Sequence, residues 1–499
     1  MNLDPIGSRQ VAVYRLDNSI YPCEPPFNPS EAYPEYQGEV NAGESNPVYG
    51  AVRESLRLLG LDGALYGTEA WNPLSELIRP GDRVVLKPNF LSQGHGLKPE
   101  EWQQIITHGS VIRALLDYVL LALEGEGTVH IIDGPQYDAD WDKILENTGT
   151  RALADYCASR SRVAIELLDL RDYQQEVHGD VICRRHPLPS DPRGGVEIDL
   201  GELSAFSGHD GAGRYYGSDY DQGETNRHHS NGRHEYRISR TAASADVFIN
   251  LPKLKTHKKV GVTLSLKNLV GINVGRNWLP HHTDGDPSTG GDQFPWGSTK
   301  THSERMVVRW LQQKSLDSSL FASLFRMGKI IGKRLYGRTD QVIRHGNWHG
   351  NDTAWRMVLD INRCLLYDNR GGCLASAPKR YFSLVDGVIG GQGDGPACAE
   401  HYPSGLIIAG LNPVAVDCAA ARLMGFDPLK IPLLRRAFDS HPLPLVEFPY
   451  EAISLVSNFP FWNGPLTALP PESTLHFKAH FGWAGEIEFK DKVEGSHGP

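Results

Sequence analysis

The feature that most constrains the fold of this chain is a repeated pattern of short apolar runs, each ending in a polar tip with glycine or proline. The runs span residues 83–86, 129–132, 247–250, 382–385 and 406–409. Continuous apolar runs of this length are typical of strands that are buried on both faces. Helical patterns lie between several of the runs. This alternation predicts an α/β fold, with a mostly parallel sheet and helices on both of its faces.

Three helices are expected from apolar periodicity and end signals. One lies within residues 46–75. A second is expected to be capped by Ser110 and to end at Gly125, and a third to open at Asn412-Pro413. In sheets of this class, ligands bind outside the carboxyl ends of the strands, which are the polar tips described above.

The 499 residues are enough for two or three domains, or for one large core with insertions. The predicted division is an N-terminal lead-in and helix (1–75), an α/β domain (76–275) with an insertion (172–240), a loop and basic-helix insertion (276–345), a second α/β half (346–460) and a C-terminal tail (461–499). The long unperiodic stretches 201–235 and 276–303 contain aromatic residues and are interpreted as ordered loop insertions that act as lids.

Charge and cysteine usage narrow the classes of partner and location. The net charge of −10 disfavours a nucleic-acid partner, so local basic clusters are interpreted as sites for small anions. The seven cysteines form no C-x-x-C pair, which predicts reduced thiols and no iron–sulfur cluster. Without a secretory signal or an apolar run long enough for a membrane span, the expected location is the cytoplasm.

Residues 304–338 form a basic amphipathic pattern with two interpretations. Apolar residues alternate there with eight lysines and arginines, opposed only by Glu304 and Asp317. Such a helix can lie on an anionic membrane or hold a partner protein. A helix packed on the body of the protein, with a solvated basic face, is the commoner arrangement and the favoured interpretation.

The strongest functional signal is a lysine-rich stretch that directly follows a buried run. Lys253, Lys255 and His257 alternate, so in extended backbone they share one face, and we expect them to be catalytic. Lys267 and Asn268 follow shortly after. So many lysines repel one another unless an anion lies among them, which predicts a site for a phosphate or a carboxylate. The alternative is a solvated surface run.

Further ligand-binding residues are expected at other polar tips. Lys87 and Asn89 follow the first run, Asp386 the fourth, and the glycine-rich loop contains Gly393, Asp394 and Gly395. Glycines allow backbone N–H groups to approach an anion, although many glycine-rich loops are merely turns. Asp417, near the start of the predicted third helix, either contacts the ligand or basic residues of the site, or compensates the helix dipole.

Histidine-rich loops leave a metal site open. His228, His229 and His234, and also His281 with His282, are possible ligands of a divalent metal, but their spacing matches no zinc motif. The stretch 345–352 contains two histidines, two asparagines and an aspartate before a helical pattern. It is interpreted either as a polar ligand site or as a helix cap.

Taken together, these motifs resemble the domain-of-unknown-function 362 family (DUF362). The matching stretches occur in family order between about residue 80 and residue 435: 85–89, 248–257, 266–271, 385–387, 393–396 and 413–417. Many members carry a ferredoxin-like cysteine segment that binds iron–sulfur clusters, and this chain lacks that segment. The basic, histidine-bearing site is also similar in architecture and residue type to that of nickel-pincer lactate racemases.

The function expected from these observations is an enzyme acting on an anionic small molecule, such as a hydroxy acid, a sugar acid or a phosphorylated sugar. The Lys/His site would act by proton or hydride transfer, as an isomerase or racemase or as an oxidoreductase. Two alternatives remain open. One is a non-enzymatic module that binds an anionic metabolite. The other is an iron–sulfur-associated redox protein, as in other members of the family.

Overall fold

The computed structural model describes residues 4–178, 181–219, 221–296, 343–368, 371–372, 374–375 and 377–489. The predicted basic helix over 304–338 lies outside these residues. Among the described residues, no helix is long and apolar enough to cross a membrane.

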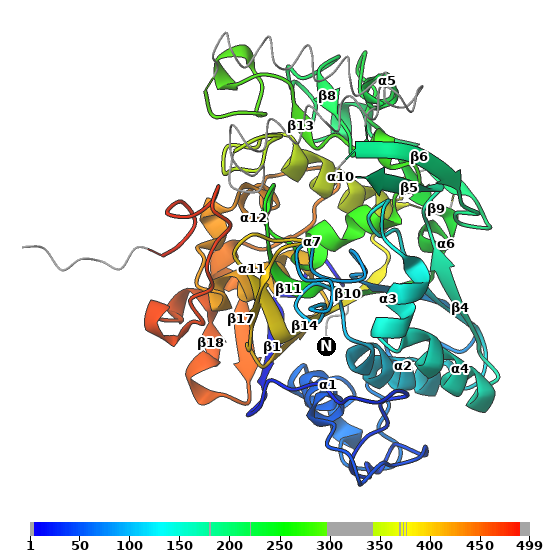
Figure 1. Cartoon of the computed structure of the whole chain (residues 1–499). Helices are drawn as coiled ribbons and strands as arrows, with labels where there is room; N and C mark the ends of the chain where they lie inside the picture. Colours follow the sequence, from blue (N-terminus) through cyan, green and yellow to red (C-terminus); the bar gives the residue numbers. More distant parts are fainter. Residues whose placement is uncertain are drawn as a thin grey trace, which may run out of the picture.

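A large sheet forms the centre of the described structure (Figure 1). Its main path runs β18 (Gly464–Pro465), β17 (Ser454–Ser457), β1 (Gln10–Arg15), β16 (Leu406–Gly410), β14 (Arg380–Gln392), β10 (Val247–Leu251), β2 (Arg83–Pro88), β3 (Thr128–Asp133) and β4 (Ala164–Asp169). The neighbours from β14 to β4 pair in parallel, whereas β16 runs antiparallel to both β14 and β1. The prediction of a mostly parallel α/β sheet is therefore confirmed.

The helices cover both faces of this sheet. Their bounds are α1 (Pro47–Leu58), α2 (Gly109–Leu123), α3 (Trp141–Asn147), α4 (Thr150–Arg160), α5 (Gln222–His228), α6 (Arg240–Ala243), α7 (Leu264–Asn268), α10 (Ala354–Tyr367), α11 (Pro413–Leu423) and α12 (Pro432–Arg436). In β2, Val84 and Leu86 pack in one core with α1 and α2, whereas Val85 packs in the other core with α7, α10 and α11. This alternation is the two-residue period of a strand buried on both sides.

The ends of two helices show how local chemistry sets their limits. Asn412 caps α11 as predicted, because its side chain accepts a hydrogen bond from the Ala415 N–H at 2.8 Å. The predicted cap of α2 was wrong. His108 takes that position, and its Nδ1 accepts from the Ser110 N–H at 3.1 Å. That helix ends at Glu124 in a left-handed conformation, one residue before the expected glycine.

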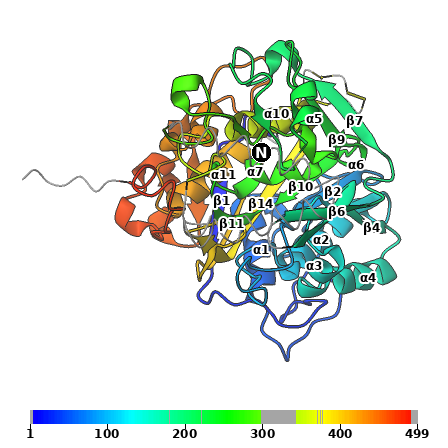
Figure 2. The same ribbon diagram turned by 45° about the horizontal axis from the view of Figure 1, so that its top comes forward.

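Smaller two-stranded ribbons lie beside the central sheet, some of them labelled in Figure 1 and others in Figure 2. They are β5 (Tyr173–His178) with β6 (Val181–Pro187), β7 (Gly195–Asp199) with β9 (Glu235–Ser239), and β8 (Tyr215–Tyr216) with β13 (His282–Thr283). The last pair joins the two predicted lid segments to each other, since His282 lies opposite Tyr216. Three further short strands complete the central sheet: β11 (Lys253–His257), β12 (Gly261–Val262) and β15 (Glu400–Tyr402). The lid function of these segments and the domain division remain predictions.

Candidate functional site

A cavity of about 420 Å³ lies where β2 and β3 end. The two strands are parallel neighbours, so their carboxyl ends meet at one edge of the sheet. Six basic residues line the cavity, against three acidic ones: Lys87, Lys255, Lys258, Lys259, Lys267 and Arg276 against Asp133, Asp138 and Asp219. A chain with a net charge of −10 thus concentrates positive charge at this one place.

Half of the predicted site residues reach this cavity. They are Lys87, Asn89, Lys255, His257, Lys267 and Asn268. The residues that do not line it are Lys253, Asp386, Gly393, Asp394, Gly395 and Asp417. Residues that line the cavity and residues that do not come from the same sequence motifs. The local backbone conformation therefore decides which side chains face the cavity.

Asn268 organises the floor of the cavity from the end of α7. Its Oδ1 accepts hydrogen bonds from Asn89 Nδ2 at 2.9 Å and from the Lys87 ammonium at 3.2 Å. Its Nδ2 donates to Asn250 Oδ1 at 2.7 Å. With its amide used in this way, Asn268 orients Asn89, whose own Oδ1 is buried without a partner among the described residues.

Lys87 is the one cavity lysine that pairs with a carboxylate in the described structure. Its ammonium lies 2.7 Å from Asp133 Oδ1, and both side chains are almost fully buried. Burial lowers the pKa of Lys87 and the adjacent Asp133 raises it in part. A Cβ at Gly271 would lie 2.1 Å from Asp133 Oδ1, so this ion pair requires glycine at that position.

Lys267 lies on α7 and differs from Lys87 in having no hydrogen bond or ion pair with any described residue. Its side chain is partly buried and lines the cavity. Burial, together with the nearby charges of Arg276 and Lys87, lowers the pKa of Lys267 to about 7. About half of such lysines are therefore neutral at physiological pH. In its charged form, the unpartnered Lys267 side chain can bind an anion. In its neutral form, the amine can accept a proton or attack a carbonyl carbon.

His257 is held as a neutral donor. Its Nδ1 accepts from the Lys259 N–H at 3.1 Å, which leaves the ring proton on Nε2. Burial and the surrounding lysines, Lys267 first, hold the pKa of His257 well below its usual value. The Nε2–H has no partner among the described residues. The imidazole is thus better suited to donate a hydrogen bond to a ligand than to take a proton.

Lys259 connects the lysine-rich stretch to the histidines of the neighbouring segment. Its ammonium donates to the His345 carbonyl at 2.5 Å. Burial and nearby Lys258 lower the pKa of Lys259 to about 7. The His282 Nδ1 atom lies 3.4 Å from the Lys259 ammonium nitrogen, and the His282 ring stacks on Tyr216. The buried His282 Nε2 has no partner among the described residues. The Thr263 hydroxyl is another buried cavity group without such a partner.

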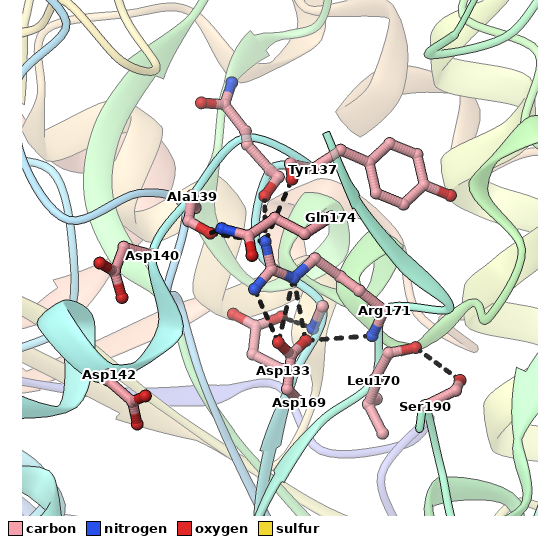
Figure 3. A network of polar contacts seen from close by, with 12 residues as sticks. Asp133, Tyr137, Ala139, Asp140, Asp142, Asp169, Leu170, Arg171, Gln174 and Ser190 are labelled. Atoms are coloured by element: carbon pink, nitrogen blue, oxygen red, sulfur yellow. Dashed lines mark hydrogen bonds and ion pairs between the residues drawn. The ribbon is translucent and has the colours of Figure 1, made fainter. Parts of the chain in front are cut away.

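The loop after β3 forms one wall of the cavity and is fixed by Arg171 (Figure 3). The Arg171 guanidinium pairs with Asp169 at 2.7 Å and donates to the carbonyls of Gln136 at 3.0 Å and Ala139 at 2.7 Å. The Gln136 carbonyl also accepts from the Ala139 N–H at 3.0 Å, and the Ala139 carbonyl from Gln174 Nε2 at 3.0 Å, so the buried arginine is one part of a hydrogen-bond network that holds this wall. Tyr137, in the same loop, stacks on Tyr173 at the cavity rim.

Lys253 and Asp386 lie in a separate, fully buried network. The Lys253 ammonium lies 3.0 Å from Asp386 Oδ2 and 2.7 Å from the Tyr21 hydroxyl, which itself donates to Asp386 Oδ1 at 2.5 Å. Neither Lys253 nor Asp386 is exposed. Between Lys253 and Lys255 the pairing of β11 with β14 shifts register, with Lys253 opposite Asp386 and Lys255 opposite Gly391. Of these two lysines, Lys255 lines the cavity.

The glycine-rich loop and Asp417 support the site from behind. Gly393 offers its carbonyl to the Thr256 hydroxyl at 2.8 Å, and Gly395 offers its carbonyl to the Lys258 N–H at 3.1 Å. Asp394 lines a different hollow. The Asp417 carboxylate accepts from the Ser265 and Leu266 N–H groups at 2.7 and 2.8 Å, which anchors α7 and hence Lys267. Burial raises the pKa of Asp417 to about 7.

The described residues contain no group of three or more histidine, cysteine or acidic side chains placed to hold a metal ion. His228 stacks on Trp278, and the two Nδ1 atoms of His229 and His234 lie 3.4 Å apart inside an aromatic cluster. His281 and His282 instead line the cavity. In the stretch 345–352, Asn351 Oδ1 accepts from the Ala354 N–H at 2.8 Å, but Thr353 occupies the N-cap position of α10. His345 lines the cavity.

Sequence reasoning missed Asp133, Arg276 and Thr263 as members of the site. Asp133 ends a predicted buried run just as Lys87 does, so the rule that selected Lys87 also applied to it. Arg276 lies in a predicted lid segment, and no local pattern marks its position. Its guanidinium donates to the Gly134 carbonyl, which closes the cavity between that segment and the end of β3.

Comparison with known proteins agrees with the motifs. Residues 210–422 match the family model described as "Domain of unknown function (DUF362)". The matched stretch includes Lys255, His257, Lys267 and Asn268, whereas Lys87 and Asp133 precede it. The predicted resemblance is thereby confirmed over this stretch.

One curated protein similar to this chain is the thylakoid-associated protein sll1697 of Synechocystis sp. (strain PCC 6803). The two are 25% identical over 361 residues, which cover 72% of this chain and 68% of the relative. The similarity therefore extends beyond the stretch that matches the family model.

Proposed function

We propose that the protein binds an anionic small molecule in the cavity at the ends of β2 and β3 and acts on it as an enzyme. The observation that carries the proposal is the set of unmatched donors there. Lys267 and the Nε2–H of His257 have no partner among the described residues, and the buried Thr263 hydroxyl has none either. Buried polar groups are normally hydrogen-bonded, so a ligand with acceptor oxygens supplies what these groups lack.

The size of the cavity favours a metabolite over a larger partner. About 420 Å³ falls in the range of roughly 300–1,000 Å³ that is typical of small-molecule sites. A hydroxy acid, a sugar acid or a phosphorylated sugar matches both this volume and the excess of basic residues. Carboxylate or phosphate oxygens would accept from Lys267, His257 and Arg276.

The proposed chemistry is proton transfer beside a carbonyl group, as in an isomerase or an oxidoreductase. Lysines with a pKa of about 7, Lys259 and Lys267, are half neutral at the working pH and are effective proton acceptors. The remaining cations stabilise negative charge that develops on the substrate oxygen. His257 acts in this scheme as a hydrogen-bond donor to that oxygen, and the lysines transfer the proton.

The proposed location is the cytoplasm, with a membrane surface as the alternative. The name of the Synechocystis relative describes thylakoid association, which for this chain would agree with the basic pattern of residues 304–338. Flotation of the full chain with liposomes of neutral and of anionic lipids decides between the two. Recovery with anionic vesicles alone supports the membrane surface, and recovery in the pellet supports the cytoplasm.

A thermal-shift screen tests the proposed function. We expect inorganic phosphate, lactate and glucose 6-phosphate to raise the unfolding temperature, and neutral glucose to leave it unchanged. The K267M variant should lose this response. A matched control is K143M, because Lys143 is half exposed and its ammonium pairs on the surface with Glu146, outside the cavity lining. Equal responses in wild type and K267M would contradict the proposal.

A further inference from the structure

We infer that Lys267 is a nucleophile that forms an imine with the carbonyl carbon of a bound keto acid or aldehyde acid. The inference deepens the proposed function and rests on it, because an anionic group must first place the ligand in the cavity. It assigns covalent chemistry to one named nitrogen and narrows the substrate class to anions that carry a carbonyl group.

The first argument is the state of the Lys267 amine. A lysine attacks a carbonyl only as the neutral amine, and desolvation or a neighbouring cation favours that form. Lys267 has both influences, since burial and the charges of Arg276 and Lys87 lower its pKa to about 7. No described residue accepts a hydrogen bond from the Lys267 nitrogen, so no such bond fixes the amine away from a ligand in the cavity.

The second argument is the contrast with the other lysines of the cavity. Lys87 is paired with Asp133, and the Lys255 nitrogen donates to the Ile105 carbonyl. Lys259 donates to the His345 carbonyl at 2.5 Å. Lys258 has no partner among the described residues, but its side chain is exposed. Lys267 is therefore the cavity lysine that combines partial burial with an unengaged nitrogen.

The third argument is the set of groups beside Lys267. Thr263 directly precedes α7 and lines the same cavity as Lys267, and its buried hydroxyl has no partner among the described residues. A hydroxyl at this place can transfer protons during the loss of water. The His257 Nε2–H and the Arg276 guanidinium line the same cavity and can hold the carboxylate of the ligand.

The reaction balances without an oxidant or a reductant. The Lys267 nitrogen forms a bond to the carbonyl carbon, and the carbon–oxygen double bond opens to a carbinolamine. The two hydrogens of the amine leave with the carbonyl oxygen as one molecule of water, and a carbon–nitrogen double bond remains. One proton taken up from water then gives the protonated imine, which acidifies the neighbouring C–H bond, the step that an isomerase needs.

The test is reduction of the imine with sodium borohydride in the presence of pyruvate or glyoxylate, followed by peptide mapping. We expect one adduct per chain, at Lys267, with a labelling rate that rises through pH 7. Surface lysines, with a pKa near 10.5, react only at higher pH. Inorganic phosphate should slow the labelling by competition. The K267R variant keeps the charge and should bind phosphate without forming the adduct, and K143M should behave as wild type.

Four results overturn the inference. Labelling spread equally over surface lysines, or unchanged in K267R, shows that Lys267 is not the nucleophile. If wild type binds inorganic phosphate but yields no adduct at Lys267, the imine fails and the proposed function stands. If wild type binds neither phosphate nor pyruvate, both fail. Because mapping is done on the wild-type chain, the outcome does not depend on the folding of a variant.

Discussion

Lys253 and Lys267 come from the same lysine-rich stretch and lie in two very different environments. Lys253 is fully buried and is compensated by Asp386 and the Tyr21 hydroxyl within hydrogen-bond distance. Lys267 lines a cavity, with cations beside it and no described partner. Both pKa values are lowered by burial, but only Lys253 has a carboxylate next to it that offsets part of the effect.

The difference teaches that a shifted pKa alone does not mark a functional lysine. A buried charge with a partner is part of the architecture, whereas a charge without one leaves a place for a ligand. The account therefore assigns Lys253 to folding and Lys267 to binding and chemistry. The same substitution at the two positions should separate these roles.

The largest expected effect is on the stability of K253M. Methionine leaves the Asp386 carboxylate buried without its cation, and breaking such a pair costs about 3–5 kcal/mol. Chemical denaturation measures the loss in the free energy of unfolding. As a control, K478M removes an exposed pair with Glu400 and should cost less than about 1 kcal/mol. If K253M were as stable as K478M, the claim that Lys253 stabilises the fold by compensating Asp386 would be contradicted.

The next effect is on anion binding by K267M. Loss of a charged hydrogen bond should weaken sulfate binding by about 1.5–3 kcal/mol, or roughly tenfold to a hundredfold. Stability should hardly change, because the variant removes a repelling cation. Isothermal titration gives the affinity and denaturation gives the stability. The comparison fails if K267M binds sulfate normally or unfolds as readily as K253M.

The pH dependence of sulfate binding tests whether the cavity lysines bind the anion in their charged forms. Sulfate stays ionised, so a change in its affinity reports on the protein. Lys259 and Lys267 lose their protons near pH 7, and a bound anion favours their charged forms. Affinity should be constant below about pH 6 and should fall by up to about tenfold per pH unit for each proton above pH 7. Titration in two buffers of different ionisation enthalpy should show proton uptake. An affinity that rises with pH would contradict this assignment.

The smallest expected effect concerns His257. If its Nε2–H only donates a hydrogen bond, H257F should weaken sulfate binding by about 0.5–1.5 kcal/mol. The H257Q variant places a donor at a similar position and should lose less. These values are measured by the same titration. Equal losses in both variants would contradict the assignment of the His257 Nε2–H as a hydrogen-bond donor to the anion.

Much of the fold was predictable because continuous apolar runs and helix caps are local signals. The runs became β2, β3, β10, β14 and β16, and the adjacent ends of β2 and β3 place Lys87 beside Asp133 although the two are far apart in sequence. The ends of parallel strands converge wherever the sheet order brings them together. That rule needs no knowledge of the loops.

The rest of the site depends on features that a sequence does not display. The alternation rule put Lys253 on the same face as Lys255, but Lys253 pairs with Asp386, which lies opposite it on β14, and only Lys255 of the two lines the cavity. Arg276 and His282 reach the cavity through the pairing of two distant loops, β8 with β13. Neither a register shift nor a loop–loop pairing has a periodic signature in these segments.

The most direct test of the account is to locate a bound anion crystallographically. Crystals of the wild-type protein would be soaked in selenate, whose selenium scatters anomalously, beside crystals of K267M. The account predicts an anomalous peak in the cavity, within hydrogen-bond distance of Lys267 Nζ and His257 Nε2, that is lost in K267M. An empty wild-type cavity, or an equal peak in both proteins, would contradict the claim that this cavity is an anion site built around Lys267.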